Sequence, residues 1–454
     1  MNIGDEFSVK VEKLSNLGLG IAKINGQVVF IENACPEDDL LIKINKINKK
    51  YANAEIKEIV TPSKYRVEPF CPMQKVCGAC QLQFIDYDYQ LKIKQEIVKD
   101  VMHSIGGIDI EIPRPVESPE IKEYRCKVQY PVSQTKVSKR ILAGYFKPKS
   151  HEIVNIKYCP IQPAICDKII EFVREKAVET GVTGYDEKNH SGDLRHVVIR
   201  YSKFNQNCLV TLVINAKKVN EKITKLSQEI FDNFDEISGV CVNFNPNKTN
   251  LIMTDNTKII AGKGHIEEKL LDKVFSFGAN SFFQVNPKSA ENIFKYVKDY
   301  INNNFVNPTV FDAYAGVTTF GIVLSDICEK VISVEECTEA VEWAKQTIID
   351  NNISNIEIHN MDAEKFFSNE NRKFNITIID PPRKGSTEKT LDSIINLTKD
   401  KIIYVSCNPA TLARDLKYLI KQGAKIDSIQ PFDMFCHTYH IENVAIIDVK
   451  DVNK

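Results

Sequence analysis

The sequence predicts an α/β protein in which a doubly wound, Rossmann-like domain follows an N-terminal OB-type β-barrel and an α+β central domain. Three observations lead to this prediction. The chain has 454 residues, and at about 150 residues per domain this length corresponds to roughly three domains. Apolar and polar residues alternate in short runs at the start, whereas strand, turn and helix patterns repeat from residue 308 onward. We expect domains at 1–60, 61–275 and 276–454.

Composition and charge restrict the class of protein. With 43% hydrophobic and 26% charged residues, the chain has enough apolar side chains for packed cores, which argues against intrinsic disorder. The first residues, MNIGDEFSVK, lack the apolar core of a secretion signal, and no apolar run approaches the length of a membrane span. We therefore expect a cytoplasmic protein that contacts no membrane and needs no obligate protein partner.

About five short antiparallel strands are expected in residues 1–60. The runs FSVKVEKL, GIAKI, QVVFI, DLLIKINKI and NAEIKEIV alternate between apolar and polar residues, and Asn- and Gly-rich turns separate them. This pattern is typical of OB-type barrels, which often bind single-stranded nucleic acid. A role as a simple packing module fits the same pattern.

The central part predicts a mixture of helices and strands. An amphipathic helix is expected over YDYQLKIKQEIVKDVMHSI (87–105), and a second helix near 163–180. Strands are expected at HVVIRY, CLVTLVINA, GVCVNF and NLIM.

A basic segment lies within this central part. The formal charge of the whole chain is −1, so a nucleic-acid site requires a local patch. Residues 121–150 contain eight Lys or Arg and one Glu, interleaved with Tyr124, Tyr130, Tyr145 and Phe146. The segment is either a solvated strand face or a surface that follows phosphates and stacks on bases.

Three of the 13 cysteines form the run C-x5-C-x2-C, at Cys71, Cys77 and Cys80. In a chain without an export signal, such a run favours metal ligands over disulfides. Cys159, in a similar Cys-Pro loop, is the best candidate for a fourth ligand. Four thiolates suit either zinc or an iron-sulfur cluster, and coincidental buried thiols are the alternative.

Polar residues lie at the ends of the C-terminal strands. The first of these strands ends in DAYAG rather than in a G-x-G-x-x-G turn, which argues against a pyrophosphate cradle and against NAD. Glu335 ends the second strand, where an acid binds ribose hydroxyls in nucleotide-binding α/β units. Asp312 or Tyr314, Asp362 and Asp380 mark neighbouring strand ends. This arrangement suits S-adenosylmethionine, which carries adenosine but no phosphate.

Cys407, in SCNPATLARDL, lies between a buried strand and a helix expected to begin at Asn408. A helix N-terminus favours a thiolate, so this residue is a candidate nucleophile. A buried structural cysteine is the other interpretation.

Six motifs resemble those of a known family: FFQVNP (282–287), DAYAG (312–316), Glu335, DPPRKG (380–385), SCNPATLARDL (406–416) and HTYHIENVA (437–445). In this order, and over essentially the whole chain, they resemble the RNA uracil-5-methyltransferase family. The N-terminal barrel is similar to the TRAM domain of that family. A TRAM domain together with a cysteine centre is similar to the branch that methylates 23S rRNA. Ala315 departs from the many relatives with Cys there, which affects cofactor fit rather than chemistry.

The resemblance implies roles for individual residues. Cys407 is expected to be the nucleophile that adds to C6 of uracil, and Glu442 the general base that removes the C5 proton. Cys436 is a rival nucleophile, but it lacks the strand-to-helix turn. The expected S-adenosylmethionine ligands are Gln284, Tyr314, Glu335 and Asp380. The expected 4Fe-4S ligands are Cys71, Cys77, Cys80 and Cys159.

RNA is the expected substrate, and the resemblance favours 23S rRNA. Arg125, Lys127 and Arg383 are candidates for RNA contacts, and the segment 89–119 is expected to pack with the methyltransferase domain. The same reaction on tRNA stays open, as does a non-catalytic RNA-binding role. Amino-group methylation is disfavoured because it places an aromatic residue where this chain has Arg383. Cytosine-5 methylation is disfavoured because it lacks the downstream His-Ile-Glu arrangement.

Overall fold

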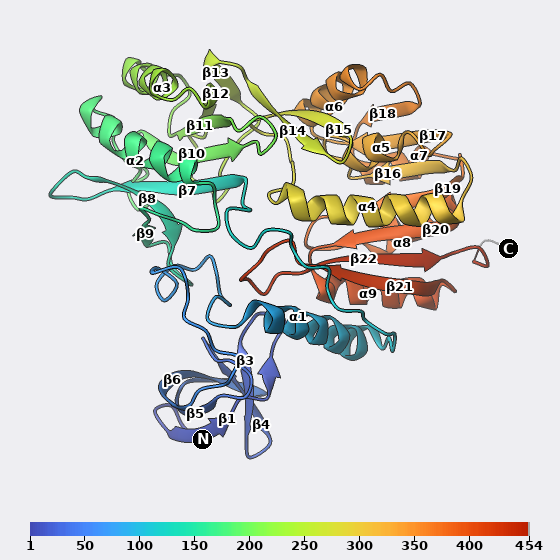
Figure 1. Cartoon of the computed structure of the whole chain (residues 1–454), viewed down its shortest axis with the longest axis horizontal. Coiled ribbons are helices and arrows are strands. Elements are labelled where there is room, and N and C mark those ends of the chain that lie inside the picture. The colour runs from blue at the N-terminus through green and yellow to red at the C-terminus, as the bar shows by residue number, and fades with distance from the viewer. Residues whose placement is uncertain (453–454) are drawn as a thin grey trace.

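The structure, a computed structural model, describes residues 1–452. Its N-terminal part is a six-stranded sheet with the order β1-β5-β6-β4-β3-β2 (Figure 1). The strands are β1 (Glu6–Lys10), β2 (Lys13–Leu14), β3 (Gly20–Ile24), β4 (Gln27–Ile31), β5 (Asp39–Ile47) and β6 (Tyr51–Thr61). This is one strand more than the five expected, because β2 forms a separate short pair with β3. The sheet is also not wholly antiparallel, since β4 and β6 run parallel.

The central part of the chain forms a seven-stranded sheet with the order β13-β12-β11-β10-β7-β8-β9. Helices α2 (Ala164–Glu179) and α3 (Glu221–Asn233) share one apolar cluster with this sheet. The strands are β7 (Lys127–Gln134), β8 (Ile141–Phe146), β9 (Ile153–Asn155), β10 (Leu194–Tyr201), β11 (Cys208–Ile214), β12 (Ile237–Phe244) and β13 (Thr257–Gly262). The expected strand at NLIM (250–253) was wrong, because those residues form a loop and the strand begins at Thr257.

The C-terminal part is the predicted doubly wound sheet, with the order β18-β17-β16-β19-β20-β22-β21. Strands β16 to β20 are parallel, and β22 runs antiparallel to both of its neighbours. The strands are β16 (Thr309–Ala313), β17 (Lys330–Glu335), β18 (Ile356–Asn360), β19 (Phe374–Ile379), β20 (Thr398–Ser406), β21 (Lys425–Phe432) and β22 (Glu442–Asp448). A hairpin of β14 (His265–Leu270) and β15 (Lys273–Gly278) precedes it.

Side chains of this sheet alternate between two apolar clusters, as the two-residue period of a strand requires. Ile402 and Tyr404 of β20 belong to one cluster, and Ile403 and Val405 belong to the other. Helices α7 (Ala363–Asn369), α8 (Glu388–Leu397) and α9 (Pro409–Lys421) contribute to the first cluster. Helices α4 (Pro287–Asn304), α5 (Thr319–Leu324) and α6 (Thr338–Asp350) contribute to the second. Both faces of the sheet are therefore covered, which confirms the predicted fold class.

Helix α1 (Tyr87–Val101) lies far from the C-terminal sheet in sequence but shares its core. Ile93, Ile97 and Val98 belong to the same apolar cluster as Leu412 and Leu416 of α9. The helix begins after Asp86, whose side chain accepts from the Tyr89 backbone N–H at 3.2 Å. It ends earlier than expected, in a π-helical turn over Met102–Gly106, and the left-handed Gly107 closes it.

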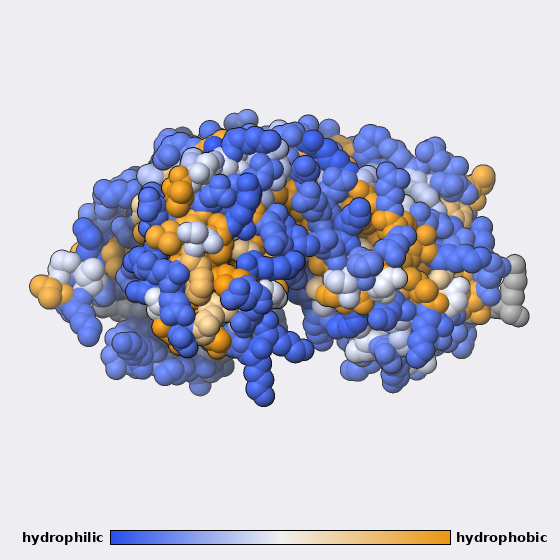
Figure 2. All heavy atoms as spheres, turned by 90° about the horizontal axis from the view of Figure 1, so that it is seen from below, coloured by the Kyte–Doolittle hydropathy of each residue, from blue (hydrophilic) through white to orange (hydrophobic). Residues whose placement is uncertain are grey.

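The N-terminal sheet is attached to this core through the same cluster. Leu14 and Cys35 belong to the apolar cluster that also contains Tyr89 of α1. Exposed Lys13 forms an ion pair with Asp100 of the same helix. Figure 2 views the molecule from the side of this sheet and shows a largely hydrophilic surface with separate apolar patches. Among the described residues, no helix combines the length and apolarity that crossing a bilayer requires.

Candidate active site

Three strand ends bring Asp380, Cys407 and Glu442 to one edge of the C-terminal sheet. Asp380 directly follows β19, and Cys407 directly follows β20. Glu442 is the first residue of β22, which runs in the opposite direction. Ser406 pairs with Asn443 in the register of β20 and β22, so the next residue out on each strand is Cys407 and Glu442. The predicted nucleophile and the predicted base are therefore neighbours across two paired strands.

The charged groups at this edge act on one another. The pKa of Glu442 is raised to about 8, mainly by burial and in addition by the nearby Asp380, while Arg383 opposes the shift. Burial raises the pKa of Asp380 to about 7. Strongly perturbed carboxyl groups that share one strand edge are typical of a functional site.

Cys407 is half-buried, and burial raises the pKa of its thiol to about 11. The Glu442 carboxylate also raises this pKa, whereas the Arg383 guanidinium lowers it. Burial and the neighbouring negative charge oppose the thiolate form that the helix N-terminus was expected to favour. Cys436, by contrast, is fully buried, and its thiol faces the Glu120 carbonyl oxygen at 3.6 Å.

Helix α9 holds the turn that carries Arg383. Asn408 is the N-cap residue of α9, and its side-chain N–H donates to the Arg383 carbonyl oxygen at 3.2 Å. The Thr411 hydroxyl donates to the same oxygen at 3.3 Å. Asp415 accepts from the Ser386 N–H at 2.9 Å and from the Tyr404 hydroxyl at 2.7 Å. The motif residues next to Cys407 thus fix the position of the DPPRKG turn.

The first turn of the sheet has a strained backbone. Tyr314 has a φ of 60°, Gly316 of 58° and Thr318 of 59°, so three of five consecutive residues are left-handed. The Thr318 hydroxyl is buried without a hydrogen-bond partner among the described residues. Glu335 closes the turn, because its carboxylate accepts from the Gly316 N–H and the Cys337 N–H, each at 2.8 Å.

Two acids of the predicted strand-end set have structural contacts. Asp312 is buried and accepts from the Gly321 N–H at 3.1 Å, so it holds helix α5. Asp362 is the N-cap residue of α7 and accepts from the Lys365 N–H at 3.0 Å. Gln284 lies elsewhere, in the wall of a cavity that it shares with Lys127 and Arg200 of the central sheet.

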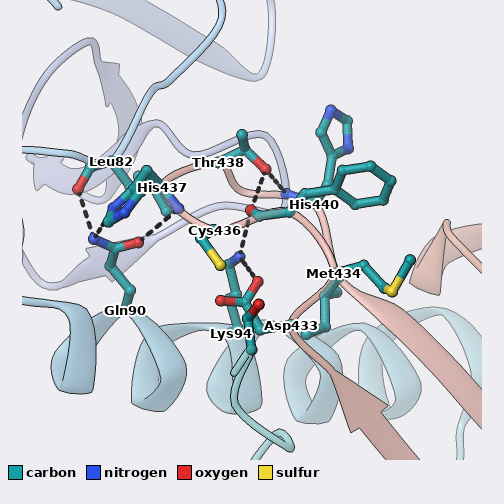
Figure 3. Close-up of polar contacts among 12 residues, drawn as sticks. Leu82, Gln90, Lys94, Asp433, Met434, Cys436, His437, Thr438 and His440 are labelled. Carbon is teal, nitrogen blue, oxygen red and sulfur yellow. Dashed lines mark hydrogen bonds and ion pairs between the residues drawn. The ribbon is translucent and has the colours of Figure 1, made fainter. Parts of the chain in front are cut away.

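The loop 433–441, which leads to Glu442, is held by helix α1 (Figure 3). Lys94 and Asp433 form a fully buried ion pair at 2.6 Å, and the Lys94 ammonium also donates to the Phe435 carbonyl oxygen at 3.2 Å. Gln90 accepts from the His437 backbone N–H at 3.1 Å. Lys94 and Gln90 were not predicted from the sequence, because charged and amide residues in an amphipathic helix are usually exposed. A buried pair of a Lys and an Asp that are distant in sequence produces no periodic pattern in the sequence.

The same loop contacts two further motifs. The His437 Nε2 lies 3.0 Å from the Ile121 carbonyl oxygen, which can only accept, so the ring proton lies on Nε2. The Tyr124 hydroxyl donates to the Cys436 carbonyl oxygen at 3.0 Å. Asn286 of the FFQVNP motif donates to the Met434 carbonyl oxygen at 3.1 Å. The motif residues around Glu442 therefore form one scaffold.

The four predicted metal ligands line a single cavity. Cys71, Cys77, Cys80 and Cys159 surround it together with mostly apolar residues. The Gln83 side-chain N–H in its wall is buried without a partner among the described residues. Within residues 1–452, however, no three His, Cys, Asp or Glu side chains are arranged so that they could hold a metal ion. The four thiols that would bind a metal therefore lie around one cavity, and a metal centre at this cavity is a proposal.

The basic segment 121–150 is only in part a surface. Tyr124 and Tyr130 are fully buried, so the interpretation that they stack on bases was wrong. Lys136, Lys139 and Arg140 are exposed in the β7–β8 connection. Tyr130 in β7 and Tyr124 in the segment before it face the core, and buried aromatic residues produce the same sequence pattern as a stacking surface.

Comparison with solved structures defines the class of protein. The structure of Pyrococcus abyssi tRNA (uracil-54, C5)-methyltransferase in complex with S-adenosyl-L-homocysteine is similar, with a TM-score of 0.77 and 27% identity. The match covers 97% of this chain and 100% of that chain. Together with the doubly wound sheet, this likeness places the protein among the S-adenosylmethionine-dependent methyltransferases.

The particular family follows from the sequence. The profile of the tRNA (uracil-5-)-methyltransferase family matches residues 86–450, and a TRAM domain profile matches residues 2–57. The chain belongs to this RNA uracil-5-methyltransferase family. An uncharacterized RNA methyltransferase of Halalkalibacterium halodurans is 37% identical over 99% of this chain and 98% of its own length. One from Synechocystis is 34% identical over 98% of this chain and 96% of its own length.

Proposed function

We propose that this protein methylates C5 of uridine in 23S rRNA through a covalent bond between Cys407 and C6 of uracil. The observation that carries the proposal is the placement of Cys407 and Glu442 on facing ends of β20 and β22. Of the two cysteines considered as nucleophile, Cys407 is half-buried and Cys436 is sealed in the core. A non-catalytic RNA-binding protein would not require a thiol and a carboxyl group to meet in this way.

The first turn of the sheet fits S-adenosylmethionine. A Cβ built on Gly316 would meet only Phe282, at 4.0 Å, so a ligand has room to approach the backbone there. The unpartnered Thr318 hydroxyl lies in the same turn. We assign Tyr314, Glu335, Asp380 and Gln284 to this cofactor, which supplies the methyl group when bound.

Residues of this protein perform the first step, the addition of a thiolate to C6 of uracil. C5 of uracil is a poor carbon nucleophile until a group adds to C6. The Cys407 thiolate forms an Sγ–C6 bond, the C5–C6 double bond opens, and the electron pair moves into an enolate whose C5 takes the methyl group. Because the pKa of the thiol is about 11, the thiol must first lose its proton, which passes to solvent water.

The same residues then reverse the addition. Glu442 takes the proton from C5, the C5–C6 double bond forms again, and the Cys407 thiolate leaves from C6. A pKa of about 8 makes the Glu442 carboxylate a stronger base than an ordinary glutamate. The target uridine must leave its stack to reach both residues, so the protein needs contacts to the RNA backbone as well as to the base.

We also propose that Cys71, Cys77, Cys80 and Cys159 hold a 4Fe-4S cluster. Four thiols around one cavity, with the unpartnered Gln83 donor in its wall, match the donor chemistry of such a cluster. Zinc suits four thiolates equally well, and analysis of bound metal separates the two.

The second candidate substrate is tRNA, and the likeness to the Pyrococcus abyssi tRNA enzyme favours it. Mapping 5-methyluridine in rRNA and tRNA from cells with and without this protein decides between them. Loss of the mark from 23S rRNA alone supports the proposal. Loss from tRNA alone means that the substrate is tRNA, and transfer of no methyl group to any uridine means that the activity is different.

A further inference from the structure

The segment 278–286, which joins β15 to α4, contains Gln284 and the exposed Phe282. Phe282 lies beside the first turn of the methyltransferase sheet, because a Cβ built on Gly316 would meet its ring and its carbonyl oxygen, each at 4.0 Å. The segment therefore borders the turn that we assign to S-adenosylmethionine. Where its main chain runs determines where the Gln284 side chain begins.

Two charged side chains hold the beginning of this segment, one from the central part of the chain and one from the C-terminal part. The Arg200 guanidinium of β10 donates to the Ala279 carbonyl oxygen at 3.3 Å and to the Ser281 carbonyl oxygen. The Glu339 carboxylate of α6 accepts from the Asn280 backbone N–H at 3.2 Å. A guanidinium only donates and a carboxylate only accepts, so each side chain satisfies a different kind of main-chain group.

Glu339 also acts as a counter-charge for Arg200. Arg200 is buried, and its hydrogen-bond acceptors at the segment are neutral carbonyl oxygens. Burial lowers the pKa of Arg200 to about 10, and Glu339 acts against this shift. A buried cation without a nearby anion is costly, so the two side chains stabilise each other as well as the segment between them. We call Arg200 and Glu339 the anchoring pair.

The packing around Glu339 leaves no spare room. A Cβ built on Gly278, the last residue of β15, would overlap Glu339 Oε1 and would lie 2.6 Å from Trp343 Nε1. Only a glycine lets the carboxylate approach the main chain this closely. Trp343 is the only tryptophan of the chain, so its fluorescence reports on this contact.

The other end of the segment is held independently. The Cys126 N–H donates to the Val285 carbonyl oxygen at 2.7 Å, and the Asn286 side chain donates to the Met434 carbonyl oxygen at 3.1 Å. Gln284 lies between these contacts and the anchoring pair. Release of either end therefore changes the main-chain position from which Gln284 extends.

We propose that Arg200 and Glu339 are positioning residues for cofactor binding, which hold residues 279–281 so that Gln284 can contact S-adenosylmethionine. The inference rests on the proposed function, because that function assigns Gln284 to the cofactor. Neither member of the anchoring pair needs to touch the cofactor, since each acts through the main chain. Helix α6 directly follows the strand that ends in Glu335, so Glu339 also ties the segment to the element that carries a second assigned ligand.

The test measures the Kd of S-adenosylhomocysteine for the full-length protein by calorimetry, without RNA. Glu339→Leu removes the acceptor, Glu339→Gln keeps a carbonyl oxygen, and Glu342→Leu is the control because Glu342 is exposed on the same helix. We expect the Kd to rise about tenfold in Glu339→Leu, as for one lost hydrogen bond to the cofactor. It should change by less than about twofold in Glu339→Gln and in Glu342→Leu. Gly278→Ala, which displaces Glu339 but removes no polar group, should raise the Kd as Glu339→Leu does.

A double-variant cycle separates positioning from a general loss of structure. Gln284→Ala should raise the Kd by itself, and adding Glu339→Leu should raise it no further, because both changes remove the same contact. Additive effects of the two changes would overturn the inference. A lower unfolding temperature of Glu339→Leu with an unchanged Kd would mean that Glu339 is only structural.

Arg200→Lys tests the other member of the anchoring pair. An ammonium lacks the planar fork that reaches two carbonyl oxygens, so we expect the Kd of S-adenosylhomocysteine to rise in this variant also. Quenching of Trp343 fluorescence by acrylamide should increase, because the released segment covers the indole less well. Unchanged quenching together with an unchanged Kd would show that Arg200 does not hold the segment.

Failure of the inference and failure of the proposed function can be told apart. S-adenosylhomocysteine binds without methyl transfer, so the calorimetry tests the anchoring pair even if the wild type methylates no uridine. If the wild type methylates uridine and Gln284→Ala weakens binding while Glu339→Leu does not, the anchoring pair is wrong and the proposed reaction stands. If Gln284→Ala leaves the Kd unchanged, the assignment of Gln284 is wrong and the inference fails with it.

Discussion

The Lys94 ammonium lies 2.6 Å from the Asp433 carboxylate, and neither side chain has any exposed surface. The pair joins helix α1 to the beginning of the loop that ends at Glu442. The Tyr87 hydroxyl completes the site by donating to the other Asp433 oxygen at 2.9 Å. The position of the predicted base therefore depends on a helix that precedes the loop by more than 300 residues in sequence.

Lys94→Met is expected to lower the free energy of unfolding by about 3–5 kcal/mol, because it leaves the Asp433 charge buried without its partner. Urea unfolding measures this change. Lys92→Met is the matched control, since Lys92 is exposed on the same helix and should change stability by less than about 0.5 kcal/mol. Equal stability of the two variants would show that the ion pair does not hold the loop.

Cys407→Ala is expected to bind RNA and S-adenosylmethionine but to form no covalent complex and no product. Binding survives because the thiol adds little contact area. Gel mobility under denaturing conditions and transfer of a labelled methyl group measure the two outcomes. Cys436→Ala serves as the comparison, and retention of methylation by Cys407→Ala together with its loss in Cys436→Ala would show that the nucleophile is wrongly assigned.

Glu442→Gln is expected to add to uracil and to methylate it, and then to stall. Elimination needs the C5 proton to leave, so a protein–RNA conjugate that resists denaturation should accumulate. RNA containing 5-fluorouridine should trap the wild type in the same way, because fluorine at C5 cannot leave as a cation. Cys407→Ala should form neither conjugate. Normal turnover of Glu442→Gln would indicate that another base acts.

The rate of methyl transfer should rise with pH, because the pKa of the Cys407 thiol is raised. The reactive form is the thiolate, and burial raises the pKa of Cys407 to about 11, so between pH 7 and 9 each pH unit increases the thiolate fraction roughly tenfold. We expect kcat/KM to increase over this range. Alkylation of Cys407 at pH 9 should be faster in Glu442→Gln, which removes a charge that raises this pKa, and slower in Arg383→Gln. The opposite order would contradict the electrostatic assignment.

Protein purified without oxygen is expected to be brown and to contain iron rather than zinc. Metal analysis and visible absorption measure this. Cys71→Ser should reduce soluble yield and stability more than the rate of the chemical step, because binding energy at the cysteine cavity is folding energy for the loops around it. Stoichiometric zinc without iron would exclude the cluster.

Short-range sequence patterns were sufficient to predict many of the strands and helices of this protein. The C-terminal strands were predictable because apolar runs bounded by turns repeat from residue 308 onward, and five of these strands, β16 to β20, are parallel. The helix over 87–105 was predictable to within its last turn, where Gly107 introduces a left-handed residue. The strand at NLIM was wrong, because apolar residues in a loop can be held by side chains, as when Asn245 donates to the carbonyl oxygens of Leu251 and Ile252.

The sequence by itself determined the class of fold, the family and the identity of the residues at the strand ends, because strand periodicity and motif order are local properties of the chain. Tertiary structure alone decided that Tyr124 and Tyr130 are buried and that Lys94 pairs with Asp433. It also decided that burial raises the pKa values of Cys407 and Glu442. The physical reason is that burial and charge pairing depend on segments distant in sequence, and a Lys or Tyr carries no local sign of what covers it.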